Sequence, residues 1–337
     1  MTRFSICLPV RNGWPYVQDC VQSILAQTCG DFELHVLDNQ STDGTDVWVK
    51  SLDDPRIHLS RSDRPLSIVE SWARIKALPK REFVTLIGHD DILDPGFLEA
   101  ISRLIEQHPD AALYQTGARL IDSQGRTIRA CQPVPARETA ADYLQARFSF
   151  QRDVFGTGFV MRSADYDRLG GIPAFEKLFF ADDALWLSLL RDSFKVCDPA
   201  EHFAVRIHPG SESASLPSAW RSILLGLSQF TLFLQEYVRN DAPARAVYED
   251  LGPGFFCVYH RNASIFALVE ASHAGHRITA DAVQQIEASL ATCAPQAAGQ
   301  LWRSPKVFML RALNASPARG LIPVLWKLYY QFKNRAR

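Results

Sequence analysis

Two pairs of adjacent carboxylates are the residues in this chain whose types and positions best suit chemistry. Asp90-Asp91 directly follows the apolar run FVTLIGH, and Asp182-Asp183 begins an apolar segment with helical spacing. Mg²⁺ and Mn²⁺ prefer oxygen ligands and often complete their coordination with phosphate oxygens. Carboxylates at the end of a strand therefore predict a site for such a cation at Asp90-Asp91.

Both pairs also have a purely structural explanation. Asp90-Asp91 can belong to a solvated turn, in which Asp91 or Asp94 caps a helix at residues 95–106. Asp182-Asp183 can be N-cap and first-turn acids, which the helix dipole favours. The residues alone leave both explanations open.

Two further polar groups follow strand-like runs. The loop Asp38–Asp43 comes after Phe32–Leu37, and His208 comes after Phe203–Ile207. Asx-rich loops are common turns, and a histidine there is either a metal or diphosphate contact or an ordinary surface side chain. Their recurrence after successive strands favours a functional role.

The first 120 residues alternate short apolar strands with helical patterns, as an α/β fold does. This order predicts a mostly parallel sheet with helices on both faces, whose ligands bind beyond the carboxyl ends of the strands. The polar loops at Arg11-Asn12, Asp38–Asp43 and Gly88–Asp91 fall at that edge. The strands are predicted at residues 4–10, 32–37, 57–59, 83–87 and 112–116, and the helices at 17–27, 45–52, 68–78 and 95–106.

From Ser218 onward the pattern is helical, with Pro and Gly breaks and without strand periodicity. Small polar residues cluster at 211–218 (SESASLPS), which is typical of a domain boundary. We therefore predict an α/β domain over residues 1–213 and a helical region over residues 214–337.

Composition excludes several classes of protein. Of the 337 residues, 47% are hydrophobic and 22% are charged, which excludes a disordered chain. The formal charge of -1 gives the whole chain no net positive charge that would attract nucleic acid. Its seven cysteines form no CxxC pair, which predicts reduced thiols in the cytoplasm. The sequence shows no signal peptide and no apolar run of the roughly 18–20 residues that span a bilayer, so we expect a soluble protein.

Several catalytic motifs are also missing. The sequence holds no GxSxG, HExxH or GxxxxGK[ST], and no GxGxxG coupled to a strand. This argues against serine hydrolases, zincins, P-loop NTPases and dinucleotide dehydrogenases.

Several segments together resemble the family 2 glycosyltransferases, which have the GT-A fold. The order and spacing of the first pieces are specific, and the resemblance covers roughly residues 3 to 213. It rests on SICLPVRNG (5–13), CVQSILAQT (20–28), DFEL (31–34), LDNQSTDGT (37–45), GHDDILDP (88–95), LGG (169–171), FFADDALWL (179–187) and RIHPGS (206–211).

The resemblance implies a role for each matching residue. In this family the opening segments form the nucleotide site, the region of residues 88–95 binds metal and donor, and an Asp three residues before a Leu (here Asp182 and Leu185) is the general base. The implied assignments are nucleotide binding for Pro9, Val10, Arg11, Asn12, Asp38 and Asn39, metal binding (Mn²⁺ or Mg²⁺) for Asp90 and His208, donor or acceptor positioning for His89 and Asp91, and catalysis for Asp182 or Asp183.

This chain departs from the family pattern at three positions. Gly88 stands in place of the first Asp of the metal motif, Ala181 in place of the acid before the base, and Asn39 in place of a second Asp. Metal ligation can thus fall to one protein carboxylate, and Asp183 competes with Asp182 as the base.

The implied reaction is an inverting transfer of a sugar from a nucleoside diphosphate, expected to be UDP, to a glycan or lipid-linked acceptor in surface polysaccharide biosynthesis. The alternatives are a non-catalytic nucleotide-sugar or glycan-binding protein on the same fold, and a nucleotidyltransferase, whose Gly-rich phosphate loop is missing here. Turnover of the donor would distinguish the transferase from the non-catalytic binding protein.

The last segment, Leu321–Arg337, combines aromatic side chains such as Trp326 with basic ones such as Lys327. A basic amphipathic tail can lie on the inner face of an anionic membrane. It can equally be an ordinary helix packed on its own domain or on a second subunit of a homo-oligomer. The sequence leaves these alternatives open.

Overall fold

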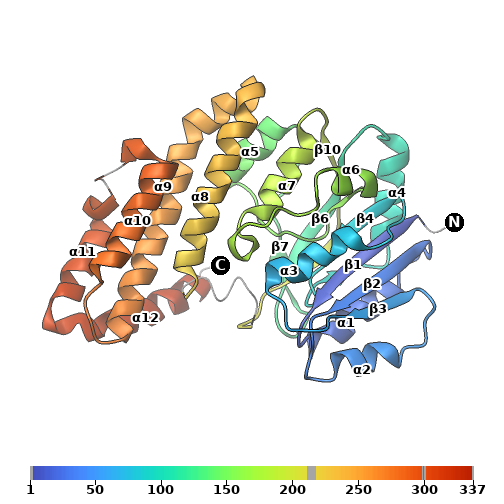
Figure 1. Ribbon diagram of the computed structural model, residues 1–337, viewed down its shortest axis with the longest axis horizontal. Coiled ribbons are helices and arrows are strands. Elements are labelled where there is room, and N and C mark those ends of the chain that lie inside the picture. Colours follow the sequence, from blue (N-terminus) through green and yellow to red (C-terminus); the bar gives the residue numbers. More distant parts are fainter. Residues whose placement is uncertain (1–2, 211–217, 298, 300, 336–337) are drawn as a thin grey trace. The chain divides into compact units, whose positions relative to one another are not determined.

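The computed structural model describes residues 3–210, 218–297, 299 and 301–335, and the chain separates into two compact units (Figure 1). The N-terminal unit is Met1–His208 and the helical unit is Pro209–Arg337. The boundary predicted between residues 213 and 214 lies in the segment 211–217, outside the described residues.

The described residues of the N-terminal unit form a ten-stranded sheet with the order β3-β2-β1-β4-β9-β6-β10-β5, in which β7 also pairs with β6 and β8 with β10. The strands are β1 (Phe4–Val10), β2 (Phe32–Asp38), β3 (Ile57–Arg61), β4 (Phe83–Leu86), β5 (Ile92–Leu93), β6 (Leu113–Ile121), β7 (Thr127–Ala130), β8 (Arg137–Glu138), β9 (Val160–Arg162) and β10 (Lys195–Arg206).

The predicted parallel arrangement holds for the first four strands. β1 lies between β2 and β4, parallel to both, and every residue of β1 is buried. Such burial on both faces explains why this strand reads as a continuous apolar run. In the register, Val10 pairs with Asp38, and Cys7 pairs with Leu86, so the loops after the three strands leave from one edge.

The rest of the sheet adds antiparallel strands and makes it mixed. β9 is antiparallel to both β4 and β6, and β5 is antiparallel to β10. β9 has three residues and follows a glycine-punctuated run, so it carries too little alternation to be predicted from the sequence.

Seven α-helices accompany the sheet in the described N-terminal unit, and Figure 1 shows them around its strands. The apolar faces of α1 and α4 join β1 and β2 in one hydrophobic core. This packing fixes the strand ends from which the candidate site is built. The helices are α1 (Tyr16–Leu25), α2 (Thr45–Lys50), α3 (Ile68–Ala73), α4 (Phe97–Gln107), α5 (Ala140–Phe148), α6 (Ser163–Arg168) and α7 (Ala181–Leu190).

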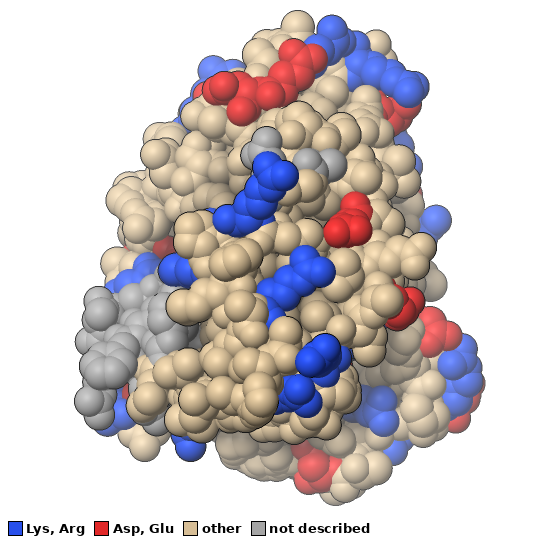
Figure 2. Space-filling view, turned by 90° about the vertical axis from the view of Figure 1, so that its left-hand side faces the viewer, with Lys and Arg blue, Asp and Glu red and all other residues tan. Residues whose placement is uncertain are grey.

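In the helical unit, α10 contacts both α8 and α9, while α11 and α12 contact α9. Figure 2 shows the side that lies at the left in Figure 1, where Lys and Arg side chains stand on a largely uncharged surface. None of the described helices is both long and apolar enough to cross a bilayer. The helices are α8 (Trp220–Tyr237), α9 (Ala242–His273), α10 (Ala280–Cys293), α11 (Pro305–Ala315) and α12 (Leu321–Arg335).

Candidate active site

The loops that follow β1 and β2 are joined by hydrogen bonds into one surface. The backbone N–H of Asn12 donates to the Ser41 hydroxyl at 2.8 Å, and the Asn12 side-chain oxygen accepts from the N–H of Thr42 at 2.8 Å. The Trp14 N–H donates to Asp43 at 2.9 Å. These contacts hold Asn12 in a left-handed conformation with φ of 53°. Segments nearly thirty residues apart thus form a single loop surface, as the sequence predicts.

The predicted nucleotide residues differ in how accessible they are. Pro9 and Val10 are buried in β1, whereas Arg11 and Asn12 are exposed. The Asp38 carboxylate is fully buried, accepts from the N–H of Ser41 and pairs with Arg61 at 3.1 Å.

Asn39 is buried as well, and its amide donates to the Leu66 carbonyl and accepts from the Leu66 N–H. In this structure Asp38 and Asn39 therefore hold the loops in place. A nucleotide hydrogen bond to either side chain has to form alongside these contacts or replace one of them.

The turn after β4 buries one carboxylate and exposes part of another. Asp91 accepts from the Thr157 hydroxyl at 2.8 Å and from the Arg206 N–H at 3.1 Å. Burial, reinforced by the charge of Asp90, raises the pKa of Asp91 to about 8. Asp91 is thus a buried, hydrogen-bonded anchor of the turn.

Asp90 faces His208, which is the last residue of the N-terminal unit in the sequence. The His208 Nε2 lies 3.0 Å from Asp90 Oδ2, and the histidine ring packs on Tyr16 with centroids 4.4 Å apart. The Arg206 guanidinium donates to the Asp90 carbonyl at 2.8 Å and to the Asp19 carboxylate at 3.0 Å. The structure thereby brings together Asp90 and His208, the two predicted metal ligands.

His89, which precedes this turn, is half-buried. Burial lowers the pKa of His89 below its ordinary value, so the imidazole is neutral at pH 7. A neutral imidazole can donate or accept a hydrogen bond without adding charge to the turn.

The donor atoms at this turn suit a hard divalent cation that is also held by its substrate. Among the described residues, no group of three or more His, Cys, Asp or Glu could hold a metal by itself. Asp90 with its 19% exposed side chain, together with His208, supplies one carboxylate and one imidazole. Mg²⁺ and Mn²⁺ commonly take few protein ligands and fill the remaining positions with phosphate oxygens and water. This pair fits such a cation with a bound diphosphate.

Gly88 creates the space into which the two carboxylates fold. A Cβ atom at this position would lie 2.8 Å from Asp90 Oδ1 and 3.0 Å from Asp91 Oδ2, both closer than normal contact. Asp91 is held from two sides by Thr157 and Arg206, so it cannot easily move away. The packing of this turn therefore leaves no room for an Asp at position 88, where the family usually has one.

We expect that Gly88→Asp weakens the site although it restores the family's usual residue. The added side chain overpacks the turn at a cost of about 1–3 kcal/mol and places a third carboxyl group beside Asp90 and Asp91. Donor binding and turnover should both fall at least several-fold in titrations with Mn²⁺. Gly30→Asp is the matched control, because nothing lies within 4 Å of a Cβ atom at Gly30. Higher activity in Gly88→Asp than in the wild type would contradict this account.

The first turn of α7 carries the second pair of carboxylates, and the two differ in environment. Asp183 is buried, accepts from the Tyr143 hydroxyl at 2.7 Å and pairs with the Arg147 Nε at 2.9 Å. Asp182 is half-buried. Burial and the neighbouring charge of Asp183 raise the pKa of Asp182 to about 7. Asp182 is thus a more basic carboxylate with part of its surface accessible.

One short segment connects the two carboxylate pairs. A Cβ atom on Gly156 would lie 3.2 Å from Asp182 Oδ2, and the next residue, Thr157, donates to Asp91. Consecutive Cα atoms are about 3.8 Å apart, so Asp182 and Asp91 approach the same stretch of backbone. The structure therefore brings the turn at Asp90-Asp91 and the start of α7 to one site.

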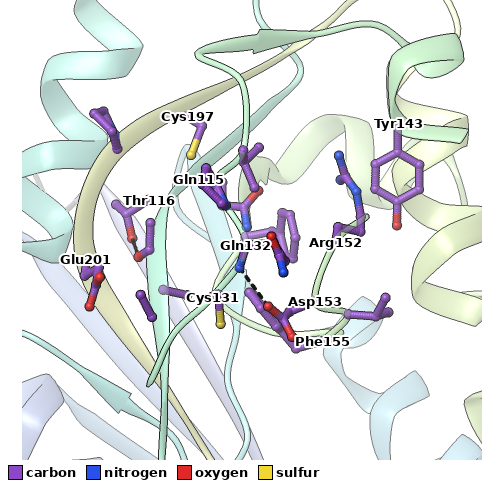
Figure 3. A pocket seen from close by; sticks show the side chains of 18 residues that line it. Gln115, Thr116, Cys131, Gln132, Tyr143, Arg152, Asp153, Phe155, Cys197 and Glu201 are labelled. Carbon is purple, nitrogen blue, oxygen red and sulfur yellow. Dashed lines mark hydrogen bonds between the residues drawn. The ribbon is translucent and has the colours of Figure 1, made fainter. Parts of the chain in front are cut away.

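A cavity of about 190 Å³ lies beside this site in the N-terminal unit (Figure 3). Its walls include Gln115 and Thr116 from β6, Glu201 from β10, and Gln132 and Asp153 from the intervening loops. Tyr143, which donates to Asp183, also lines it, and so do the residues immediately before Gly156. The cavity thus shares a wall with the candidate catalytic carboxylates.

The residues that orient these carboxylates carry no pattern that reveals the role in the sequence. Thr157 and Tyr143 lie in segments without a motif. Arg147 lies on α5, a helix that is not among those predicted from the sequence. Arg206 is the exception, because it lies two residues before His208 in a segment with a family resemblance. Its position next to a predicted ligand could have marked it.

Comparison with known proteins identifies the N-terminal unit. Residues 5–169 match the model of Glycosyl transferase family 2. The N-terminal unit belongs to glycosyltransferase family 2. An uncharacterized glycosyltransferase of Rickettsia typhi is 27% identical to this chain over 131 residues, which are 38% of this chain and 40% of that protein. This chain spans less than half of the length of the curated relatives that it matches.

Solved structures share the fold of this chain. TarS 1-349 of S. aureus, in complex with UDP-GlcNAc, has a TM-score of 0.63 and 13% identity, over 97% of this chain and 92% of that chain. The mannosyltransferase PcManGT of Pyrobaculum calidifontis, in complex with GDP-Man and Mn²⁺, has a TM-score of 0.52 and 14% identity, over 97% of this chain and 87% of that chain. The predicted family and its GT-A fold are confirmed.

Proposed function

We propose that this family 2 glycosyltransferase moves a sugar from a nucleoside diphosphate donor, with UDP as the nucleotide, to a hydroxyl of a glycan or lipid-linked acceptor, with inversion of configuration. The observation that carries this proposal is the approach of Asp182 and Asp91 to the adjacent residues Gly156 and Thr157. A basic carboxylate for the acceptor and a diphosphate-binding turn for the donor then meet at one reaction centre.

Asp182 is the general base in this proposal. Its ionised carboxylate accepts the proton of the acceptor hydroxyl, and the oxygen attacks the anomeric carbon. The bond from that carbon to the phosphate oxygen breaks on the opposite side, and the nucleoside diphosphate leaves with the electron pair. The transition state resembles an oxocarbenium ion, as in glycoside hydrolysis. Asp183 cannot easily share this role, since Tyr143 and Arg147 occupy its carboxylate.

In this proposal Asp90 and His208 would hold Mn²⁺ or Mg²⁺, which would supply positive charge to offset that of the leaving diphosphate. Asp91 and Arg206 keep the turn that carries Asp90 in place. His89, as a neutral imidazole, positions donor or acceptor. Arg11 and Asn12 line the nucleotide site above Pro9 and Val10, and Asp38 and Asn39 shape its floor.

The cavity beside Asp182 is evidence in favour of an acceptor that contains a sugar ring. An engineered cavity of about 150 Å³ holds a benzene ring, so the roughly 190 Å³ found here accommodates one six-membered ring. Its walls mix amides and carboxylates with apolar carbon, which matches the hydroxyl groups and apolar faces of a sugar.

The cellular setting remains a proposal that follows from the acceptor. Surface polysaccharide biosynthesis on lipid-linked acceptors places the enzyme in the cytoplasm, at the inner face of the membrane. Residues 214–337 then contribute contacts with the acceptor, with a second copy or with the membrane surface. TarS and PcManGT bind UDP-GlcNAc and GDP-Man, respectively, which supports a nucleotide-sugar donor for this chain.

The proposal is tested by thermal-shift measurements with UDP-, GDP- and dTDP-sugars, with and without Mn²⁺, followed by product analysis. A donor at 100 times its Kd should stabilise the protein by about 2.7 kcal/mol. We expect Asp90→Asn to remove the Mn²⁺-dependent part of the shift. Asp110→Asn is the matched control, since Asp110 is exposed and lies outside the site.

Product analysis decides between an enzyme and a binding protein. Release of nucleoside diphosphate together with a glycoside of inverted anomeric configuration supports the proposal. Donor binding without turnover across an acceptor panel favours a non-catalytic nucleotide-sugar-binding protein. Release of pyrophosphate indicates a nucleotidyltransferase.

A further inference from the structure

The end of the chain has a charge pattern that differs from that of the rest. Residues 301–337 contain no Asp or Glu and eight Lys or Arg residues. Since the whole chain carries -1, residues 1–300 carry -9. Such an asymmetry favours an anionic partner for the end of the chain. The basic residues are Arg303, Lys306, Arg311, Arg319, Lys327, Lys333, Arg335 and Arg337.

α12 turns an apolar stripe toward solvent. Its exposed side chains recur at the i, i+3, i+4 and i+7 positions that form one face of a helix. On another face, Ile322 is buried and Trp326 contacts Phe266 of α9. The helix is therefore attached to the helical unit by one side and leaves the other uncovered. The exposed stripe is Leu321 (54%), Val324 (55%), Leu325 (48%) and Leu328 (46%).

α11, which contacts α12, carries further exposed apolar side chains. Phe308 is 64% exposed and Met309 is 60% exposed, while Val307 next to them is buried in the core of the helical unit. Exposed Lys306 and Arg311 flank them on the same helix. Figure 2 shows Lys and Arg side chains on a largely uncharged surface on the side that lies at the left in Figure 1, with acidic side chains mainly near the edges.

The charge and the exposed apolar area together indicate which kind of partner could bind this surface. A second copy would bring two segments of like charge together, which opposes self-association. No described helix can cross a bilayer, so insertion across the membrane does not explain the stripe. An exposed helix face of Leu and Val with Lys and Arg residues beside it is typical of helices that lie in the membrane interface.

We propose that the α11–α12 surface docks on an anionic lipid bilayer. The surface is defined by Arg303, Lys306, Phe308, Met309, Arg311, Leu321, Val324, Leu325, Lys327 and Leu328. Its apolar side chains enter the boundary between headgroups and acyl chains, and its cations contact the headgroups. The side chains of residues 329–337, which add Tyr329, Tyr330 and Phe332 to the same segment, lie outside the described residues.

The test is sedimentation of the full-length chain with phosphatidylcholine vesicles, with and without phosphatidylglycerol. We expect at least tenfold stronger partitioning onto the anionic vesicles at low salt, weakened at high salt because the lipid charge is screened. Each Lys or Arg near such a surface contributes roughly fivefold. Equal partitioning onto both kinds of vesicle, or none onto either, overturns the proposal.

Variants locate the contact on the proposed surface. Leu325→Glu with Leu328→Glu should abolish vesicle binding, and Arg311→Glu with Lys327→Glu should reduce it at least tenfold. Leu225→Glu with Leu232→Glu is the matched control, because these side chains of α8 are 57% and 60% exposed. It should leave binding unchanged.

Two further measurements keep the result interpretable. Thermal melting establishes that each variant is folded, and the charge variants, which alter exposed side chains, carry the test if the double Leu variant is not. Gel filtration with light scattering measures the oligomeric state. A dimer that the Leu325→Glu and Leu328→Glu changes convert to a monomer overturns membrane docking in favour of a second copy. The readouts need no donor or acceptor, so the docking proposal can fail or succeed independently of the proposed transfer reaction.

Discussion

Asp182→Asn is expected to lower kcat for sugar transfer by about 10²–10⁴-fold while donor binding is retained. Asparagine keeps the shape of the side chain but cannot take a proton from the acceptor hydroxyl. The measurement is the rate of glycoside formation at saturating donor and acceptor, with donor affinity followed by thermal shift. Wild-type turnover in Asp182→Asn would show that another group is the base.

The pH dependence of the wild type provides a second check on Asp182. Burial and Asp183 raise the pKa of Asp182 to about 7, and only the ionised form is a base. The value of kcat/KM should therefore fall about tenfold per pH unit as the pH drops below about 7. A rate that stays level down to pH 5 contradicts the assignment.

The same shift predicts that Asp182→Asn makes the folded protein more stable above pH 7. The folded pKa of Asp182 lies above that of the unfolded chain, so the folded state prefers the protonated carboxyl. Stability from this group is present at low pH and is lost as the pH rises through about 7. Asparagine removes the penalty, and Tm at pH 8 should increase by a few degrees. A folded, more stable and inactive variant separates catalysis from structure.

Asp183→Ala should have the opposite effect and destabilise the protein by about 3–5 kcal/mol. Its carboxylate is buried and pairs with Arg147, whose side chain is only 5% exposed. Removing one partner of a buried ion pair leaves the other charge uncompensated in the interior. Urea unfolding monitored by circular dichroism measures the loss, and poor expression of the variant is a related outcome.

Tyr143→Phe is the graded companion to this variant. It removes one hydrogen bond to Asp183 and leaves the Arg147 pair intact, so the free energy of unfolding should fall by about 1 kcal/mol. If Asp183→Ala instead folds normally and loses only turnover, Asp183 is the base and the proposed division between the two carboxylates is wrong.

Asp182 and Asp183 have different roles because successive side chains of a helix point in different directions. Asp183 points among Tyr143 and Arg147, where it stabilises the start of the helix, and Asp182 lies against Gly156. The glycine allows this approach, since any side chain there would crowd the Asp182 carboxylate. Asp182, whose pKa is raised, and the firmly held Asp183 form one unit in which structural stability supports a reactive group.

The sequence by itself determined the α/β order of the first 120 residues, the loops that carry the site and the family. Strands such as Phe4–Val10 are apolar throughout because a parallel strand is buried on both faces, and this pattern is local. The opening segments are likewise read within a short stretch of chain. The location of the loops at one sheet edge follows from the direction of parallel strands.

Only the tertiary structure decided which carboxylate is accessible and what each polar side chain contacts. Asp90 meets His208 across 118 positions of sequence, and Asp91 meets Thr157 across 66. Asp38, predicted to contact the nucleotide, is buried against Arg61. Contacts between distant segments depend on how strands and helices pack, and hydrophobic periodicity reports only the face that each element buries. The residue types predicted a site with carboxylates, and the packing of distant segments determined the environment of each carboxylate.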